Sequence, residues 1–171
     1  KANAAVDVLL KEGYDFVYVH VEAPDEMGHQ GSVDRKVKAI EYLDEKFDEI
    51  YIDKILGLTL SPDAIKNQKD LVFVYTPIHG TGGQIIPRLF KKAGFSNFHT
   101  VEEQMVIDGN FPTVVSPNPE EKAALTLAIE KAKKVNADVV LATDPDADRV
   151  GIAVKDENGE PEGVYDLQGR K

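Results

Sequence analysis

The chain has 171 residues, a formal net charge of −10, a hydrophobic fraction of 42% and no cysteine. The hydrophobic fraction is that of a globular protein with a packed core, and the absence of cysteine excludes disulfides and cysteine-based metal sites. Nucleic acid and anionic membranes both need a basic protein face, so the acidic balance argues against either as a partner. No apolar run is long enough to cross a membrane, and the start does not resemble a signal peptide. The chain begins at Lys1 rather than Met, which leaves open a preceding segment.

The first part of the chain predicts a helix, a strand and a second helix. Residues 2–11 have apolar side chains on one side and precede Gly13, which predicts a helix that stops there. Residues 16–21 are rich in valine and aromatic side chains and predict a strand. Residues 22–31 predict a polar loop. Apolar residues at helical spacing over about 33–56 predict a long helix.

Asp25 and His29 are the candidate metal ligands of this first part. They stand four residues apart after the predicted strand, so they could offer one oxygen and one imidazole to a metal. The surrounding sequence YDFVYVHVEAPDEMGHQG, residues 14–31, resembles the cofactor-independent phosphoglycerate mutases, and so does the helix that follows. In that family the Asp and His of this motif bind a divalent metal. The family's other ligands and its serine nucleophile are not found here, and two ligands are too few for a tight site. We therefore expect exposed loop residues without a metal.

From residue 51 onward the pattern is that of an alternating α/β domain. Ser61 followed by proline predicts the start of a short helix. Residues 71–76 predict a buried strand, residues 77–83 a glycine-rich turn, and residues 84–93 a helix that Gly94 ends. The turn has neither the lysine of a phosphate-binding Walker loop nor the third glycine of a dinucleotide fingerprint. A tight turn is therefore the favoured interpretation. A phosphate site at the start of the helix remains an alternative.

Three more strands complete the predicted sheet, and one more helix is predicted between them. Residues 97–101, 139–143 and 151–155 predict strands. Asn118 and Pro119 predict the beginning of a helix, with the asparagine as its cap and the proline in its first position.

Three carboxylates, those of Asp144, Asp146 and Asp148, alternate along the loop between the last two strands. Alternate side chains of an extended or turning backbone share a side, so the three can converge. Like charges repel unless a cation lies between them, and Mg²⁺ prefers such oxygen ligands. Arg149 follows, with a planar fork suited to phosphate. An EF-hand is excluded because its sixth and twelfth positions, counted from Asp144, hold Arg149 and Lys155 instead of Gly and Glu. A solvated acidic turn is the remaining alternative.

The sequence TDPDADRVG, residues 143–151, resembles the metal-binding loop of the phosphohexomutases, the phosphoglucomutase and phosphomannomutase family. The segments TPIHGTGG, EQ, DGNFPTV and PNPEE precede it in the order found in that family. The resemblance spans about residues 51–160, the extent of that family's second domain. It implies that the three aspartates bind Mg²⁺, with Mn²⁺ as a substitute, and that Arg149 is catalytic beside the phosphoserine.

These patterns predict an α/β fold: a mixed, mostly parallel four-stranded sheet with helices on both faces and an N-terminal helix–strand–helix appendage. The resemblance to the phosphohexomutases implies the strand order 2-1-3-4, with the last strand antiparallel. The expected divisions are residues 1–50, 51–160 and a tail over 161–171. We expect a mosaic, either natural or constructed, whose main part is a cytoplasmic phosphomutase fragment. The family's serine loop and its clamp for the sugar's phosphate are not found, so we expect inactivity alone and sugar-phosphate binding only with the missing domains. The alternatives are a metal-binding or structural module without catalysis, or a fragment of a metal-dependent phosphoglycerate mutase.

Overall fold

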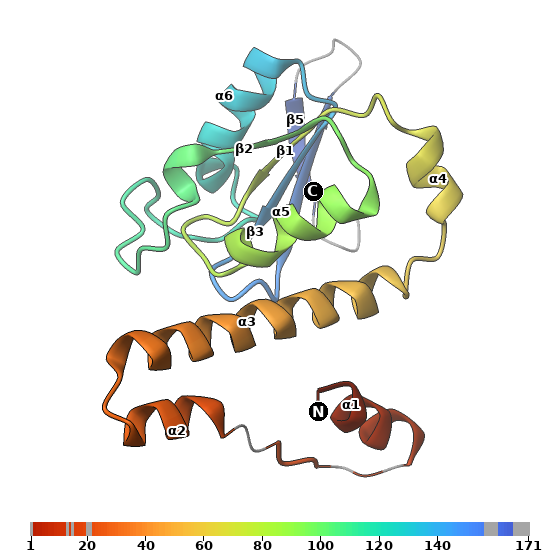
Figure 1. The fold of residues 1–171 in the computed structure, drawn as a ribbon. Coiled ribbons are helices and arrows are strands. Elements are labelled where there is room, and N and C mark those ends of the chain that lie inside the picture. Colours follow the sequence, from red (N-terminus) through yellow and green to blue (C-terminus); the bar gives the residue numbers. More distant parts are fainter. Residues whose placement is uncertain (1, 13, 15, 20–21, 156–160, 166–171) are drawn as a thin grey trace. The chain divides into compact units, whose positions relative to one another are not determined.

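The structure is a computed structural model that describes residues 2–12, 14, 16–19, 22–155 and 161–165 (Figure 1). The chain divides into two compact units, residues 1–58 and 59–171, and each is described by itself. The expected division of the chain into residues 1–50, 51–160 and 161–171 stays a prediction. Among the described residues, no helix combines the length and the apolar composition that crossing a membrane requires.

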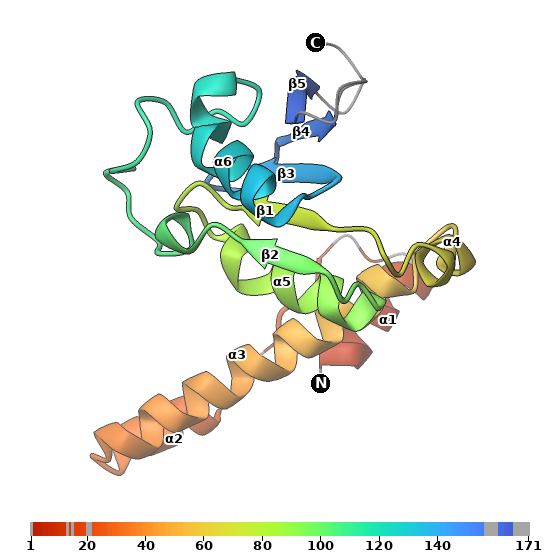
Figure 2. The same ribbon diagram turned by 90° about the horizontal axis from the view of Figure 1, so that it is seen from above.

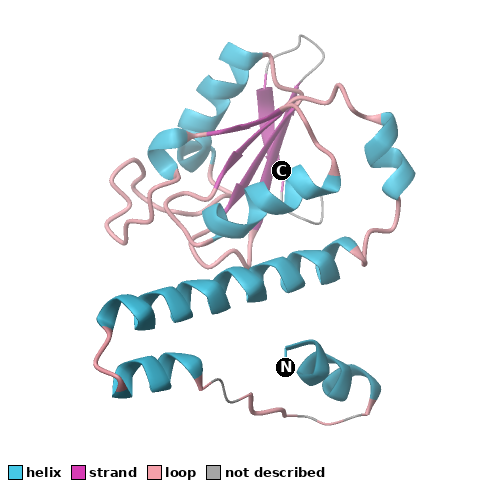
Figure 3. Ribbon diagram, viewed as in Figure 1, coloured by secondary structure: helices cyan, strands magenta, loops and turns pink. Residues whose placement is uncertain are grey.

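The described part of the first unit consists of helices and their connections, drawn in Figure 3. The helices are α1 (Ala2–Lys11), α2 (Ala23–His29) and α3 (Val33–Leu56). The predictions of helices over 2–11 and 33–56 are confirmed. The prediction of a polar loop over 22–31 is wrong, because α2 occupies most of it. A proline in the first turn and two acidic side chains near the positive end of the helix dipole favour this helix.

The predicted strand over residues 16–21 is also wrong where the structure describes it. Residues 16–19 are an irregular connection, and residues 20 and 21 lie outside the described residues. Phe16 and Tyr18 are 78% and 75% exposed. A strand needs a neighbour to satisfy its backbone N–H and C=O groups, and the described residues of this unit contain no other strand.

The second unit is an α/β domain built on one sheet. Its elements are α4 (Pro62–Asn67), β1 (Phe73–Thr76), α5 (Gly82–Ala93), β2 (Phe98–Thr100), the 3₁₀ turns η1 (Glu102–Gln104) and η2 (Lys122–Leu125), α6 (Thr126–Val135), β3 (Val139–Thr143), β4 (Val150–Lys155) and β5 (Pro161–Tyr165). The strand order is β2-β1-β3-β4-β5, with β1, β2 and β3 parallel and β4 antiparallel to β3. The predicted order of four strands is confirmed. A fifth strand, β5, pairs with the outer edge of β4 and lies within the predicted tail.

Helices cover both faces of the sheet, as predicted: Figure 2 shows α6 on one side and α5 on the other. Successive residues of β1 point to opposite faces, which explains why the strand is buried throughout. Val74 packs in a core with Val140 and the alanines of α6. On the other face, the ring of Phe73 meets that of Phe90 from α5 edge to face, with 4.9 Å between centroids. Gly94 ends α5 as predicted, at φ 104, a left-handed conformation that glycine adopts without strain.

The predicted helix start at Asn118 and Pro119 is wrong. Residues 118–121 form a turn, followed by η2, and α6 begins only at Thr126. Asn118 does accept a hydrogen bond from the Glu120 amide, at 3.1 Å, but within this turn. Pro119 is fully buried, and its carbonyl lies so close to Gly151 of β4 that a side chain there would collide with it. Packing against the sheet therefore holds these residues out of a helix.

Candidate metal site

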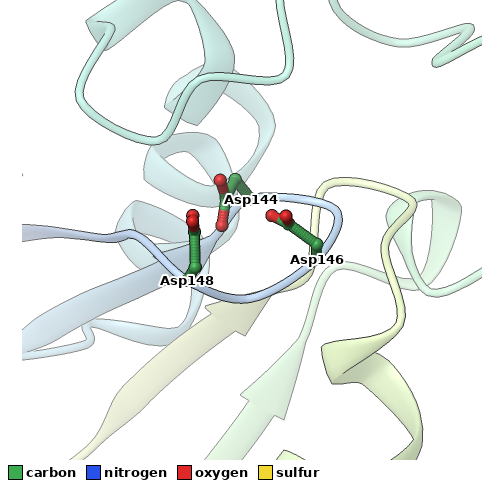
Figure 4. Close-up of side chains that lie close together, drawn as sticks. All are labelled: Asp144, Asp146 and Asp148. Carbon is green, nitrogen blue, oxygen red and sulfur yellow. The ribbon is translucent and has the colours of Figure 1, made fainter.

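The acidic loop, residues 144–149, joins β3 to β4 at the carboxyl end of β3 (Figure 4). The neighbouring strand β1 continues through α5 to β2 on its other side. The carboxyl ends of β1 and β3 thus form the point where the connections diverge, which is where ligands bind in open α/β sheets. The loop and the turn after β1 meet at this point.

Asp144 is the buried member of the acidic loop, only 1% exposed. One carboxylate oxygen accepts a hydrogen bond from the Arg149 amide at 2.9 Å, and the other accepts one from Arg149 Nε at 2.8 Å. Burial alone would raise the pKa of Asp144, but the amide and guanidinium of Arg149 outweigh it and hold that pKa below its ordinary value. The carboxylate is therefore ionised and fixed in orientation.

Asp146 and Asp148 are exposed, and each offers a carboxylate oxygen within 4.8 Å of the other and of Asp144 (Figure 4). A hydrogen bond with Asp144 and the negative charge of Asp146 raise the pKa of Asp148. This is the behaviour of like charges gathered without enough positive charge between them. The donor set consists of carboxylate oxygens, which suits a hard divalent cation such as Mg²⁺.

Arg149 links the acidic loop to the turn at residues 118–121. Besides its bonds to Asp144, it donates from Nη1 to the side-chain oxygen of Asn118 at 3.3 Å. The hydrogen bond to Asp144 raises the pKa of Arg149, so the side chain stays charged. Its side chain is 47% exposed, so the guanidinium is held on one side and open to a ligand on the other.

The glycine-rich turn after β1 lies directly against the acidic loop. The Thr81 amide donates to the Pro145 carbonyl at 2.8 Å. His79, in this turn, is buried, and both ring nitrogens have partners: the Val106 carbonyl at 2.8 Å and the Thr113 hydroxyl at 2.9 Å. Since a carbonyl can only accept, Nδ1 of His79 carries a proton. His79 thus anchors the turn instead of facing a substrate.

Asp25 and His29 are one turn apart on α2, with 3.2 Å between carboxylate and imidazole. Their side chains are 68% and 75% exposed. Within the described residues, the one group of three or more side chains placed to hold a metal together is that of Asp144, Asp146 and Asp148. The pair on α2 therefore gains no third ligand from the part of the chain that the structure describes.

Two contacts of the site were not foreseen from the sequence: Asn118 with Arg149, and Thr81 with Pro145. Each joins segments more than thirty residues apart in the sequence. The available signal was that TPIHGTGG and PNPEE precede the acidic loop in a fixed order, which indicates a shared site without giving the contacts.

The fold and the loop define an α/β domain with a carboxylate cluster at the switch point of its sheet. Residues 49–159 match the family model described as phosphoglucomutase/phosphomannomutase, alpha/beta/alpha domain II, and the chain belongs to that family. The predicted resemblance is thereby confirmed. Residues 1–82 match the model of the metalloenzyme superfamily. This range includes residues 1–50, the part in which the sequence resembles phosphoglycerate mutases, and extends beyond it.

Individual relatives agree with this assignment. A probable phosphomannomutase of Haemophilus influenzae is 44% identical over 117 residues, covering 68% of this chain and 23% of the relative. A phosphoglucomutase of Staphylococcus haemolyticus is 48% identical over 93 residues, covering 54% of this chain and 17% of the relative. A crystal structure of a phosphoglucomutase/phosphomannomutase family protein from Burkholderia thailandensis matches with a TM-score of 0.52 at 28% identity, covering 69% of this chain and 22% of that one. The chain thus spans less than a quarter of the length of these three proteins.

Proposed function

We propose that this chain supplies the metal-binding part of a phosphomutase that transfers a phosphoryl group on a sugar phosphate. Asp144, Asp146 and Asp148 hold Mg²⁺, or Mn²⁺ in its place, and Arg149 contacts the phosphoryl group. The observation that supports this most is the convergence of three carboxylates beside a fixed arginine, at the switch point of a domain of this family.

The surroundings of each residue indicate its role in the site. Asp144 is buried and bound twice by Arg149, so it fixes the guanidinium as well as contributing negative charge. Asp146 and Asp148 are exposed and can reach a cation from solvent. A divalent ion at this site supplies positive charge beside the phosphoryl oxygens when bound. The open side of Arg149 adds two or more N–H donors in a plane, the geometry that suits a phosphoryl group.

We further propose that the 171-residue chain by itself does not interconvert sugar phosphates. A phosphomutase works through a nucleophile that carries the phosphoryl group, and the covalent route is lost without it. The serines of the chain are Ser32, Ser61, Ser96 and Ser116. None lies in a sequence like the family's serine loop, and none belongs to the acidic loop. We expect no turnover of glucose 1-phosphate with Mg²⁺ and a bisphosphate activator. Turnover that disappears in Asp144→Ala would show that the chain is an enzyme by itself.

Metal binding is tested by calorimetric titration of the full chain with Mn²⁺. The wild type should bind weakly, because no phosphoserine oxygen completes the site, and Asp146→Asn should bind less still. Glu130→Gln is the matched control, since Glu130 is an exposed acid on α6 and its replacement removes the same charge. Equal heats from the wild type and Asp146→Asn would contradict the assignment of the metal to this loop.

The metalloenzyme match over residues 1–82 supports one alternative, a fragment of a metal-dependent phosphoglycerate mutase. In that case Asp25 and His29 would bind the metal, and replacing both with alanine would remove one binding equivalent. The same titration separates the two proposals, because the phosphomutase proposal assigns that equivalent to Asp146. If neither set of substitutions changes the heats, the chain is a structural α/β module.

A further inference from the structure

We propose that Thr81 is a positioning residue for the acidic loop, and that it acts on Asp146 through the carbonyl of Pro145. This inference rests on the proposed metal function of the loop. It gives the glycine-rich turn after β1 a role that neither its sequence nor the family match assigns.

Thr81 makes two contacts with one acceptor. Its amide donates to the Pro145 carbonyl at 2.8 Å, and its hydroxyl donates to the same oxygen at 3.0 Å. The preceding glycine allows this approach: a Cβ on Gly80 would lie 2.3 Å from Pro145 Cα and 2.6 Å from its oxygen. Only a residue without a side chain fits there, so the two backbones are in direct contact.

The hydroxyl of Thr81 is used in an unusual way. Thr81 occupies the N-cap position of α5, where a threonine hydroxyl commonly accepts a hydrogen bond from a helix amide. Here it makes no such cap bond and donates outward to the acidic loop instead. Removing the hydroxyl therefore takes a contact from the loop without uncapping the helix.

Asp146 is the carboxylate that most needs this support. Asp144 is held by two hydrogen bonds from Arg149, and Asp148 lies 3.8 Å from the same guanidinium. The described residues show no hydrogen bond to the Asp146 side chain, so the surrounding structure holds Asp146 through its backbone. The Pro145 carbonyl belongs to the peptide group that ends at the Asp146 nitrogen. Hydrogen bonds to this carbonyl therefore fix the orientation of the peptide group to which Asp146 is attached.

The turn that carries Thr81 is itself held firmly. Ile78 and His79 have φ of 46° and 63°, a conformation that costs of order 1–3 kcal/mol per residue outside glycine. Hydrogen bonds of the buried His79 maintain it: the amide donates to the Gln104 carbonyl at 2.9 Å, and the ring binds the Thr113 hydroxyl at 2.9 Å. Strain that persists in this way is frequently found where a residue must be placed accurately.

The test compares Thr81→Val, which keeps the shape and removes the hydroxyl, with Thr81→Ser, which keeps the hydroxyl. Two quantities are measured on the full chain: the dissociation constant for Mn²⁺, and the hydrogen exchange of the Ala147 amide in metal-free protein. That amide donates to the Asp144 carbonyl at 3.0 Å and reports on the loop turn. The Val74 amide at the sheet centre is the reference for global unfolding.

We expect Thr81→Val to weaken Mn²⁺ binding and to speed Ala147 exchange, each by roughly three- to tenfold, the equivalent of one hydrogen bond. Thr81→Ser should stay within about twofold of the wild type on both measures, and Val74 exchange should not change in either variant. Unchanged Mn²⁺ affinity in Thr81→Val, or an equal loss in Thr81→Ser, would overturn the inference. If the wild type binds no Mn²⁺, the proposed function fails. Exchange then decides the positioning role: faster Ala147 exchange in Thr81→Val alone supports it, and equal exchange overturns it.

Discussion

Replacing Gly151 with alanine should destabilise the second unit by moving the turn at residues 118–121. Gly151 is a buried residue of β4 that pairs with Ala142 of β3. A Cβ there would lie 2.0 Å from the carbonyl oxygen of Pro119 and 2.7 Å from its carbonyl carbon. Both are backbone atoms, so no side-chain rotation relieves the overlap. Pro119 is itself fully buried, which limits how far the turn can retreat.

The size of the effect follows from two opposing terms. Inserting an extra methyl group into a packed site costs about 1–3 kcal/mol of unfolding free energy. Replacing glycine with alanine returns about 0.4–1 kcal/mol, because the unfolded chain becomes less flexible. The net loss should be about 1–2 kcal/mol, and the first term dominates because the colliding neighbour is backbone.

Amide hydrogen exchange at β1 and β3 is the appropriate measurement, since it reports the opening of the sheet unit whatever residues 1–58 do. A loss of about 1–2 kcal/mol speeds exchange of the slowest amides by roughly five- to thirtyfold. Gly109→Ala is the matched control, because nothing lies within 4 Å of a Cβ at Gly109. The control should change exchange by less than about fivefold.

Equal exchange in Gly151→Ala and Gly109→Ala would refute the reasoning. It would mean that the turn at residues 118–121 shifts freely, and the packing of Pro119 would no longer explain why α6 begins so late.

Three further predictions concern titratable groups and the first unit. Hydrogen bonds from the Val72 amide and from Lys155 lower the pKa of Asp138. Its ionised form therefore stabilises the fold above pH 3.8, the ordinary pKa, and this stabilisation is lost as pH falls through the lowered pKa. The urea midpoint of Asp138→Asn should accordingly depend less on acid pH than that of the wild type. Burial raises the pKa of Tyr75 from 10.0 to about 12. Between these pH values the tyrosine ionises in the unfolded state but not in the folded state, so stability should fall from pH 10 to pH 12. The urea midpoint of Tyr75→Phe should not show this fall. Replacing Asp25 and His29 with alanine should leave Mn²⁺ affinity unchanged, and a lost binding equivalent in calorimetry would contradict the assignment of the metal to the acidic loop.

Some of what the sequence predicted failed where a local pattern was overruled by its surroundings. Residues 16–19 have the composition of a strand but no described neighbour to pair with. Asn118 and Pro119 have the composition of a helix start, yet packing on Gly151 holds them in a turn. In both cases propensity measures a local preference, whereas the outcome depends on which other segment lies beside it.

The sequence by itself determined the α/β class and the three carboxylates of the acidic loop, and its resemblance to a known family implied the order of the four predicted strands. The class and the carboxylates are local properties: apolar periodicity follows secondary structure, and alternate residues in a short loop are neighbours in any fold. Only the tertiary structure decided that Asp144 is buried and bound by Arg149, that Asn118 accepts a further hydrogen bond from this guanidinium, and that Thr81 contacts Pro145. The contacts of Asn118 and Thr81 join segments distant in sequence. The Thr81 contact exists because parallel strands bring the carboxyl ends of β1 and β3 together, which no local pattern encodes.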